Sequence, residues 1–142
     1  MSWNVPNETE MDTIEQSQSV FIPDLTAGHF KGMIEQVDID TDEHGKEIQD
    51  KFLLAIRVAE TGNHEHVGKL MRYMHYMKDK KGKFIPANYR FLATLDPSIK
   101  AGGSWHPTKL MLIEFEATIS YSGKYWNFTD PVFIEKHKDF GF

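Results

Sequence analysis

The sequence predicts an all-β (mainly) fold, and three features of the 142-residue chain indicate this class. Short runs of alternating apolar and polar residues recur along it, as expected of strands with one buried face. Turn-forming segments rich in Gly, Asn and Asp separate these runs. Aromatic residues make up 13% of the chain, and flat rings pack well on a pleated sheet.

Three strands are expected in the first half of the chain. Residues 29–40 form the first, where Gly32 breaks the alternation and predicts a bulge or strong coiling. Residues 69–77 form the third, and a lysine-rich loop, KDKKGKF, follows it. Residues 51–60 form the second strand, whose apolar residues share one face: Phe52, Leu54, Ile56 and Val58.

One helix and a final hairpin are expected in the second half. Apolar residues recur at helical spacing after Pro86, and Pro97 ends that run. Residues 109–121 form a long strand, and a tight Ser-Gly turn leads to a returning strand over residues 124–129. The following segment, PVFIEK, is a candidate continuation of that strand past Pro131.

This order is that of a five-stranded OB-type Greek-key barrel with one short helix between strands 3 and 4. Another small barrel, or an open antiparallel sheet with one helix, is the alternative. We expect the barrel over residues 28–136, followed by a short tail, residues 137–142. An acidic and mobile arm, residues 1–27, would precede it, with five carboxylates and neither Lys nor Arg: Glu8, Glu10, Asp12, Glu15 and Asp24.

Composition excludes several classes of protein. The chain has no cysteine, which excludes a disulfide framework, a cysteine zinc site and a cysteine nucleophile. Its first residues lack the basic region and apolar run of a secretory signal. No apolar stretch is long enough to span a bilayer. We therefore expect a soluble, cytoplasmic protein without a membrane partner.

Charge is distributed unevenly along the chain. The net charge is −5, yet residues 69–90 hold seven Lys or Arg and one acid, Asp79. Single-stranded nucleic acid is bound by cations that neutralise phosphates and by rings that stack on bases, and this segment interleaves both. An ordinary solvated loop is the alternative. The nucleic-acid-binding candidates are Arg57, Lys69, Arg72, Tyr73, His75, Tyr76, Lys78, Lys80, Lys81, Lys83, Arg90, Lys124, Tyr125 and Trp126.

Alternation restricts where the candidate rings can point. On the third strand Tyr73 lies on one face and Tyr76 on the other, and the sequence leaves open which face is outward. On the final hairpin Tyr125 and Trp126 also alternate, so only one of them can face the core. The outward ring would stack on a base, or the two rings would serve only in cross-strand packing.

Neither a catalytic nor a metal site is expected. His64 and His66 could share a metal ion, but a catalytic zinc needs a third protein ligand, and their spacing does not match H-E-x-x-H. The carboxylates between residues 38 and 50 lack motif spacing and indicate a solvated acidic hairpin. We predict no enzyme and no cofactor, with a small metal-dependent enzyme that uses these histidines as the open alternative.

Two segments resemble one family of proteins. The blocks HFKGMIEQVDID, KFLLAIRV and GKLMRYM, and the later block KLMLIEFEATISYSGKYWNFTDPVF, resemble small phage-encoded proteins found among replication and recombination genes. The resemblance covers about residues 20–135 and implies an OB-fold single-stranded DNA-binding protein. Such proteins often end in a strongly acidic tail capped by phenylalanine, whereas this chain ends in the mixed sequence IEKHKDFGF, so tail-mediated docking is not carried over.

The expected function is sequence-tolerant binding of single-stranded DNA in phage-type DNA replication or recombination. Single-stranded DNA is the expected partner, with replication or recombination proteins as further candidates. The alternative is a non-catalytic structural or protein-interaction domain of a phage or mobile element. Stacking and phosphate contacts also suit RNA, so the sequence leaves the choice between the two nucleic acids open.

Overall fold

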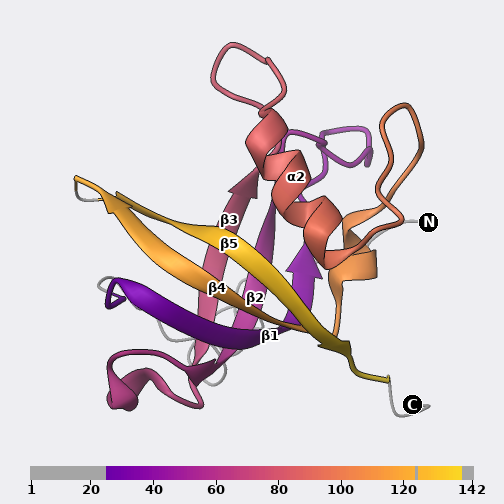
Figure 1. Ribbon diagram of the computed structural model, residues 1–142. Helices are drawn as coiled ribbons and strands as arrows, with labels where there is room; N and C mark the ends of the chain where they lie inside the picture. The colour runs from indigo at the N-terminus through magenta and orange to yellow at the C-terminus, as the bar shows by residue number, and fades with distance from the viewer. Residues whose placement is uncertain (1–24, 124, 139–142) are drawn as a thin grey trace.

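The computed structural model describes residues 25–123 and 125–138 (Figure 1). Residues 1–24 of the expected arm and residues 139–142 of the expected tail lie outside this part. A mainly β fold with a helix between the third and fourth strands is confirmed. The elements are β1 (Gly28–Asp38), β2 (Lys51–Glu60), η1 (His64–His66), β3 (Leu70–Tyr76), α2 (Pro86–Leu95), η2 (Pro107–Leu110), β4 (Ile113–Ser122) and β5 (Tyr125–Lys136).

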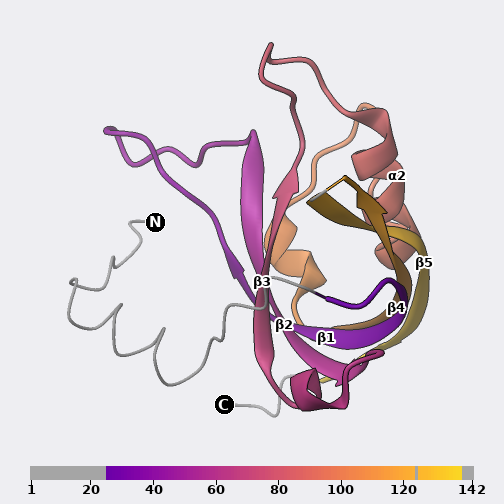
Figure 2. The same cartoon turned by 90° about the vertical axis from the view of Figure 1, so that its left-hand side faces the viewer.

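The strands form one curled antiparallel sheet in the order β3-β2-β1-β4-β5 (Figure 2). The expected closed barrel is not formed, because β3 and β5 are the two edges and no backbone ladder joins them within the described residues. Rings join these edges instead. The Tyr73 ring lies 4.7 Å from that of Phe128 and 5.4 Å from that of Trp126, between centroids.

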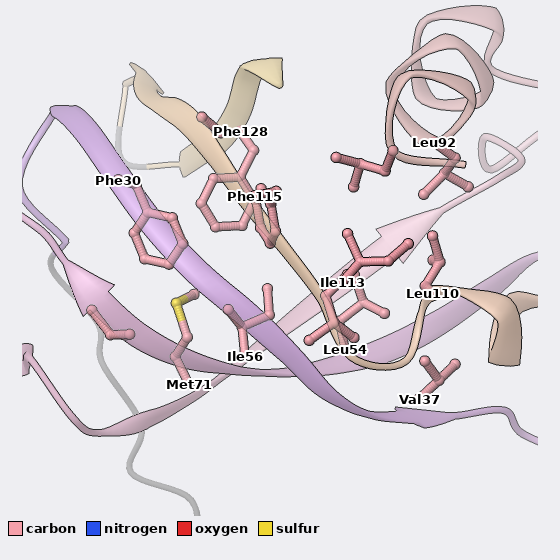
Figure 3. Packing of buried hydrophobic residues seen from close by; sticks show 14 of the residues in the cluster. Phe30, Val37, Leu54, Ile56, Met71, Leu92, Leu110, Ile113, Phe115 and Phe128 are labelled. Atoms are coloured by element: carbon pink, nitrogen blue, oxygen red, sulfur yellow. The ribbon is translucent and has the colours of Figure 1, made fainter. Parts of the chain in front are cut away.

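Apolar side chains from all five strands and from α2 meet on the concave side of the sheet (Figure 3). Phe128 lies near the middle of this core, 4.8 Å from Phe30 and 5.6 Å from Phe115 between ring centroids. Leu92 and Leu95 of α2 are buried against the same cluster. The inward face predicted for β2 is confirmed, since all four of its alternating apolar residues are buried: Phe52, Leu54, Ile56 and Val58.

β4 differs from its expected limits, whereas β5 continues as its sequence allows. β4 begins at Ile113 rather than at residue 109, because the preceding residues form η2 and Leu112 adopts a positive φ of 68°. β5 continues past Pro131. Asp130, with a φ of 51°, lies at an irregularity in the β4–β5 ladder that accommodates the proline.

Gly32 lies where β1 crosses closely over β2. The register shifts between Lys31 and Gly32, so the predicted irregularity is confirmed. A Cβ atom at residue 32 would lie 2.7 Å from Ile56 Cγ2 and 2.9 Å from the backbone oxygen of Arg57. Both distances are shorter than real carbon contacts, so glycine allows the approach that lets the sheet coil.

Three connections gather at one end of the molecule (Figures 1 and 2). They are the β1–β2 loop (39–50), the β3–α2 loop (77–85) and the α2–η2 connector (96–106). His106 Nε2 lies 2.8 Å from Glu47 Oε1 and links the connector to the β1–β2 loop. The β2–β3 turn lies at the opposite end. No helix in the described ranges is long and apolar enough to cross a membrane.

One ionisable side chain of β3, His75, lies in the core. It is 2% exposed, with the rings of Phe52 and Phe91 at 5.4 and 5.7 Å between centroids. Its Nε2 lies 3.1 Å from the backbone oxygen of Asn88. Burial lowers the pKa of His75 to about 4, although the contact with Asn88 opposes this effect. The imidazole is therefore neutral at pH 7.

Replacing Gly32 with Ala is expected to lower the free energy of unfolding by roughly 2–3 kcal/mol, because the backbone oxygen of Arg57 must move. Urea denaturation measures the change. Gly45→Ala is the control, since its added methyl meets nothing and costs only the strain of a left-handed residue, about 1 kcal/mol. Equal losses in the two variants would contradict the close approach at Gly32.

His75 is expected to make stability depend on pH. In the unfolded chain its pKa returns to the ordinary 6.5, so between pH 6.5 and about 4 the unfolded state binds more protons. The free energy of unfolding should therefore decrease as the pH falls through this window, by up to about 3 kcal/mol. Urea denaturation at several pH values should show this loss in the native chain and a smaller one in His75→Phe. Identical pH profiles in the native chain and in His75→Phe would mean that other ionisable groups cause the loss of stability.

Candidate nucleic-acid interface

The two faces of β3 differ in burial, and this difference shows which face points toward the core. His75 is buried and Tyr73 is half-buried against the core, whereas Arg72 and Tyr76 are exposed. The alternation left open by the sequence therefore resolves with Tyr73 inward and Tyr76 outward.

The sequence predicts that Tyr73 and His75 contact nucleic acid, but the structure places both on the inner face. Tyr73 packs between β5 side chains, and burial raises its pKa although a backbone hydrogen bond from Phe128 acts in the opposite direction. His75 is enclosed and neutral. Neither side chain can stack on an external base or bring charge to a phosphate, so we leave both out of the candidate site.

The outward residues of β2 and β3 combine cations with flat and apolar side chains. The register places Lys51 opposite Tyr76, and Leu53 opposite Met74. Lys51 Nζ lies 5.8 Å from the centroid of the Tyr76 ring, which is 49% exposed. Lys51 was absent from the predicted set because its position beside Tyr76 depends on strand pairing. We call these outward residues the β2–β3 face: Lys51, Leu53, Arg72, Met74 and Tyr76.

The lysine-rich segment over residues 79–83, which we call the basic loop, is held by its one aspartate. Asp79 Oδ1 accepts hydrogen bonds from the backbone N–H groups of Lys81 (2.8 Å) and Lys83 (3.0 Å). The Asp79 N–H donates to the backbone oxygen of Lys83 at 2.8 Å. The carboxylate thus holds the backbone. Lys80, Lys81 and Lys83 are exposed, and none belongs to an ion pair in the described part of the chain.

Phe84 is an exposed ring at the base of the basic loop that the predicted set omits. A backbone bridge joins it to Lys78, whose Nζ lies 4.9 Å from the ring centroid. Phe84 is 60% exposed and packs edge-on against Tyr89. Lys78 is less available than its neighbours, because it is partly buried and 3.5 Å from Asp50. An aromatic directly after the lysine run was the sequence signal for this position.

The β4–β5 hairpin divides its two rings between outside and inside. Tyr125 is 68% exposed. Trp126 is half-buried, with its ring 5.4 Å from Tyr73 and 5.2 Å from Phe128 between centroids. The predicted alternation is confirmed, and Tyr125 is the more exposed of the two rings. Lys124 lies outside the described residues.

Two predicted cations, Arg57 and Lys69, lie apart from this surface, and a third lies in a cleft beside it. Arg57 donates two hydrogen bonds of 2.9 Å to the Glu35 carboxylate, and this pairing raises the Arg57 pKa. Arg57 pairs with Leu70 at the start of β3, next to Lys69, whereas the basic loop follows the end of that strand. The seven residues of β3 separate the two ends by about 20 Å. Arg90 lies on α2 and lines a cleft beside that helix.

The structure does not bring His64 and His66 together with a third metal ligand. They lie in η1, and neither belongs to a described group of three side chains close enough to share an ion. Ion pairs already engage both such groups, with 2.8 Å between His29 and Glu60 and 2.8 Å between His137 and Glu114. We assign no metal to them. The two groups are His29, Glu60 and Glu116, and Glu114, Glu135 and His137.

The chain's own geometry therefore defines the candidate interface: the β2–β3 face, the basic loop, Phe84 and Tyr125. Comparison with protein-family models, with curated proteins and with solved structures finds no match to this chain.

Proposed function

We propose that this protein binds single-stranded DNA, in a sequence-tolerant manner, on the β2–β3 face, the basic loop and the hairpin ring. One observation carries the proposal: the three exposed lysines of the basic loop, which belong to no ion pair in the described part of the chain, directly precede the exposed ring of Phe84. The lysines neutralise phosphates, while Tyr76, Phe84 and Tyr125 offer flat surfaces to bases. A single strand fits these rings better than a duplex, whose bases already stack on one another.

The arrangement of strands supports an OB-type barrel as the basis of this activity. The sheet is antiparallel and curled, a helix follows its third strand, and rings join the two edges that would close it. In OB folds the face of strands 2 and 3 and the loop between strands 4 and 5 bind oligonucleotides. The β2–β3 face and Tyr125 occupy the corresponding positions.

Two carboxylates of the sheet are engaged in ion pairs and lie away from the proposed site. Glu35 is paired with Arg57, and Glu114 lies 3.3 Å from Lys31. These acids belong to β1 and β4, away from the β3 edge and the basic loop. Salt screens charge effects beyond about 10 Å, so the local excess of lysine attracts phosphate despite a net charge of −5.

The family resemblance supports a biological context for this proposal. The protein would act in phage-type DNA replication or recombination, in the cytoplasm of the host cell, as a non-catalytic protein. Replication or recombination proteins would then be its further partners.

A protein-interaction domain is the second candidate function. Val132, Phe133 and Ile134 are all exposed on β5, which is an edge strand. An exposed apolar segment on a sheet edge is typical of a protein contact. A gel shift with oligo-dT at low and moderate salt separates the candidates, because only the DNA-binding protein shifts the oligonucleotide.

Replacing Lys80, Lys81 and Lys83 with Ala is expected to flatten the salt dependence of oligo-dT binding. Each neutralised phosphate adds about 0.7 to the slope of log K against log salt, so the slope should decrease by about 2. Fluorescence titration over a series of salt concentrations measures it. The control variant replaces three exposed lysines elsewhere with Ala and so removes the same charge: Lys46, Lys109 and Lys138. Equal slopes in the two triple variants would remove the basic loop from the site.

The two hairpin rings are expected to respond differently to substitution. Tyr125→Ala should weaken oligo-dT binding about tenfold and leave the melting temperature nearly unchanged, since stacking is worth about 1–3 kcal/mol per base. Trp126→Ala should mainly destabilise the fold, by about 2–3 kcal/mol, because it removes packing between β5 and β3. Unchanged affinity in a folded Tyr125→Ala protein would make the hairpin a packing element only.

A further inference from the structure

A cleft of about 840 Å³ opens at the end of the molecule where the three long connections gather. The β1–β2 loop, α2 and the α2–η2 connector line it, and Phe52 and Met77 are buried residues of its lining. This volume lies within the roughly 300–1,000 Å³ typical of small-molecule sites. The cleft is therefore large enough to hold a group as large as a nucleotide.

Fixed rings line the cleft. Trp105 lies 6.3 Å from Phe52 between ring centroids, and its indole N–H donates to Asp96 Oδ2 at 2.8 Å. Phe84 and Tyr89 form an edge-on pair at 5.7 Å on the helix side. Rings held in place by neighbours lose little freedom on binding, which favours stacking with a flat ligand.

The charge of the cleft is positive. Lys51, Arg90 and Lys100 line it, while Glu47 is the one acid among its described lining residues. His106 Nε2 lies 2.8 Å from the Glu47 carboxylate and engages it. Neither Arg90 nor Lys100 belongs to an ion pair in the ranges that the structure describes. Aromatic walls with available cations complement an anionic aromatic group.

The cleft is continuous with the surface proposed to bind DNA. Lys51 belongs to the β2–β3 face and also lines the cleft. Phe84 stands at the base of the basic loop and also lines the cleft. A DNA strand bound on the β2–β3 face therefore reaches the cleft without crossing another surface.

We propose that the cleft binds one unpaired nucleotide of the DNA strand held on the β2–β3 face. Its base stacks on the lining rings, and its phosphate is held by Arg90 and Lys100. This inference rests on the proposed single-stranded DNA binding and adds to it a pocket at which the strand leaves the outer face.

The test compares Arg90→Ala/Lys100→Ala with Lys46→Ala/Lys138→Ala. Both double variants lose the same charge. All four side chains are exposed, so we expect both variants to fold, and thermal unfolding checks this. The cleft variant should bind oligo-dT about tenfold more weakly than the native chain, with a salt slope smaller by about 0.7, since both side chains hold one phosphate. The affinity of the control variant for oligo-dT should decrease by less than about threefold.

A second measurement reports on the cleft directly. The NMR signal of the Trp105 indole N–H, identified by its loss in Trp105→Phe, should shift when oligo-dT is added to the native chain and shift much less in Arg90→Ala/Lys100→Ala. The inference requires both results. If the native chain binds oligo-dT but either result is absent, the nucleotide site is overturned and DNA binding stands. If the native chain does not bind oligo-dT, both proposals fail.

Discussion

Ring contacts between the two edges of the curled sheet determine which residues are left for function. Phe128 of β5 touches Tyr73 of β3 and rings from three further elements: Phe30, Phe91 and Phe115. Each aromatic pair is worth about 0.5–1.5 kcal/mol beyond its buried area, so the cluster outweighs the net gain of one backbone hydrogen bond. Because Tyr73 is drawn inward, the alternation of β3 places Arg72 and Tyr76 outside.

The aromatic residues consequently divide into two populations. The larger one closes the core around Phe128, and Trp126 belongs to its margin. The smaller one is exposed and includes Tyr76, Phe84 and Tyr125 of the candidate interface, with Tyr121 and Phe133 elsewhere on β4 and β5. Exposed rings contribute little to folding, and the proposed function assigns Tyr76 and Phe84, each of which lies near a lysine Nζ, to stacking on bases.

The charges divide in a parallel way. Two cations of the sheet are paired with carboxylates, Arg57 with Glu35 and Lys31 with Glu114. The Asp79 carboxylate instead accepts hydrogen bonds from the backbone of the basic loop. The lysines of this loop therefore remain available to phosphate although the chain as a whole is acidic. A net charge alone would have argued against a polyanion as ligand.

Periodicity and glycine geometry are local properties, so the sequence alone predicts the strands, the helix, the irregularity at Gly32 and the inward face of β2. It could not orient β3, whose run LMRYMHYM is apolar or amphipathic on both faces. Contact with β5, more than fifty residues later, decided that His75 is core and Tyr76 is surface. The open sheet edge and the cleft also required the tertiary structure, because packing between segments distant in the chain creates both.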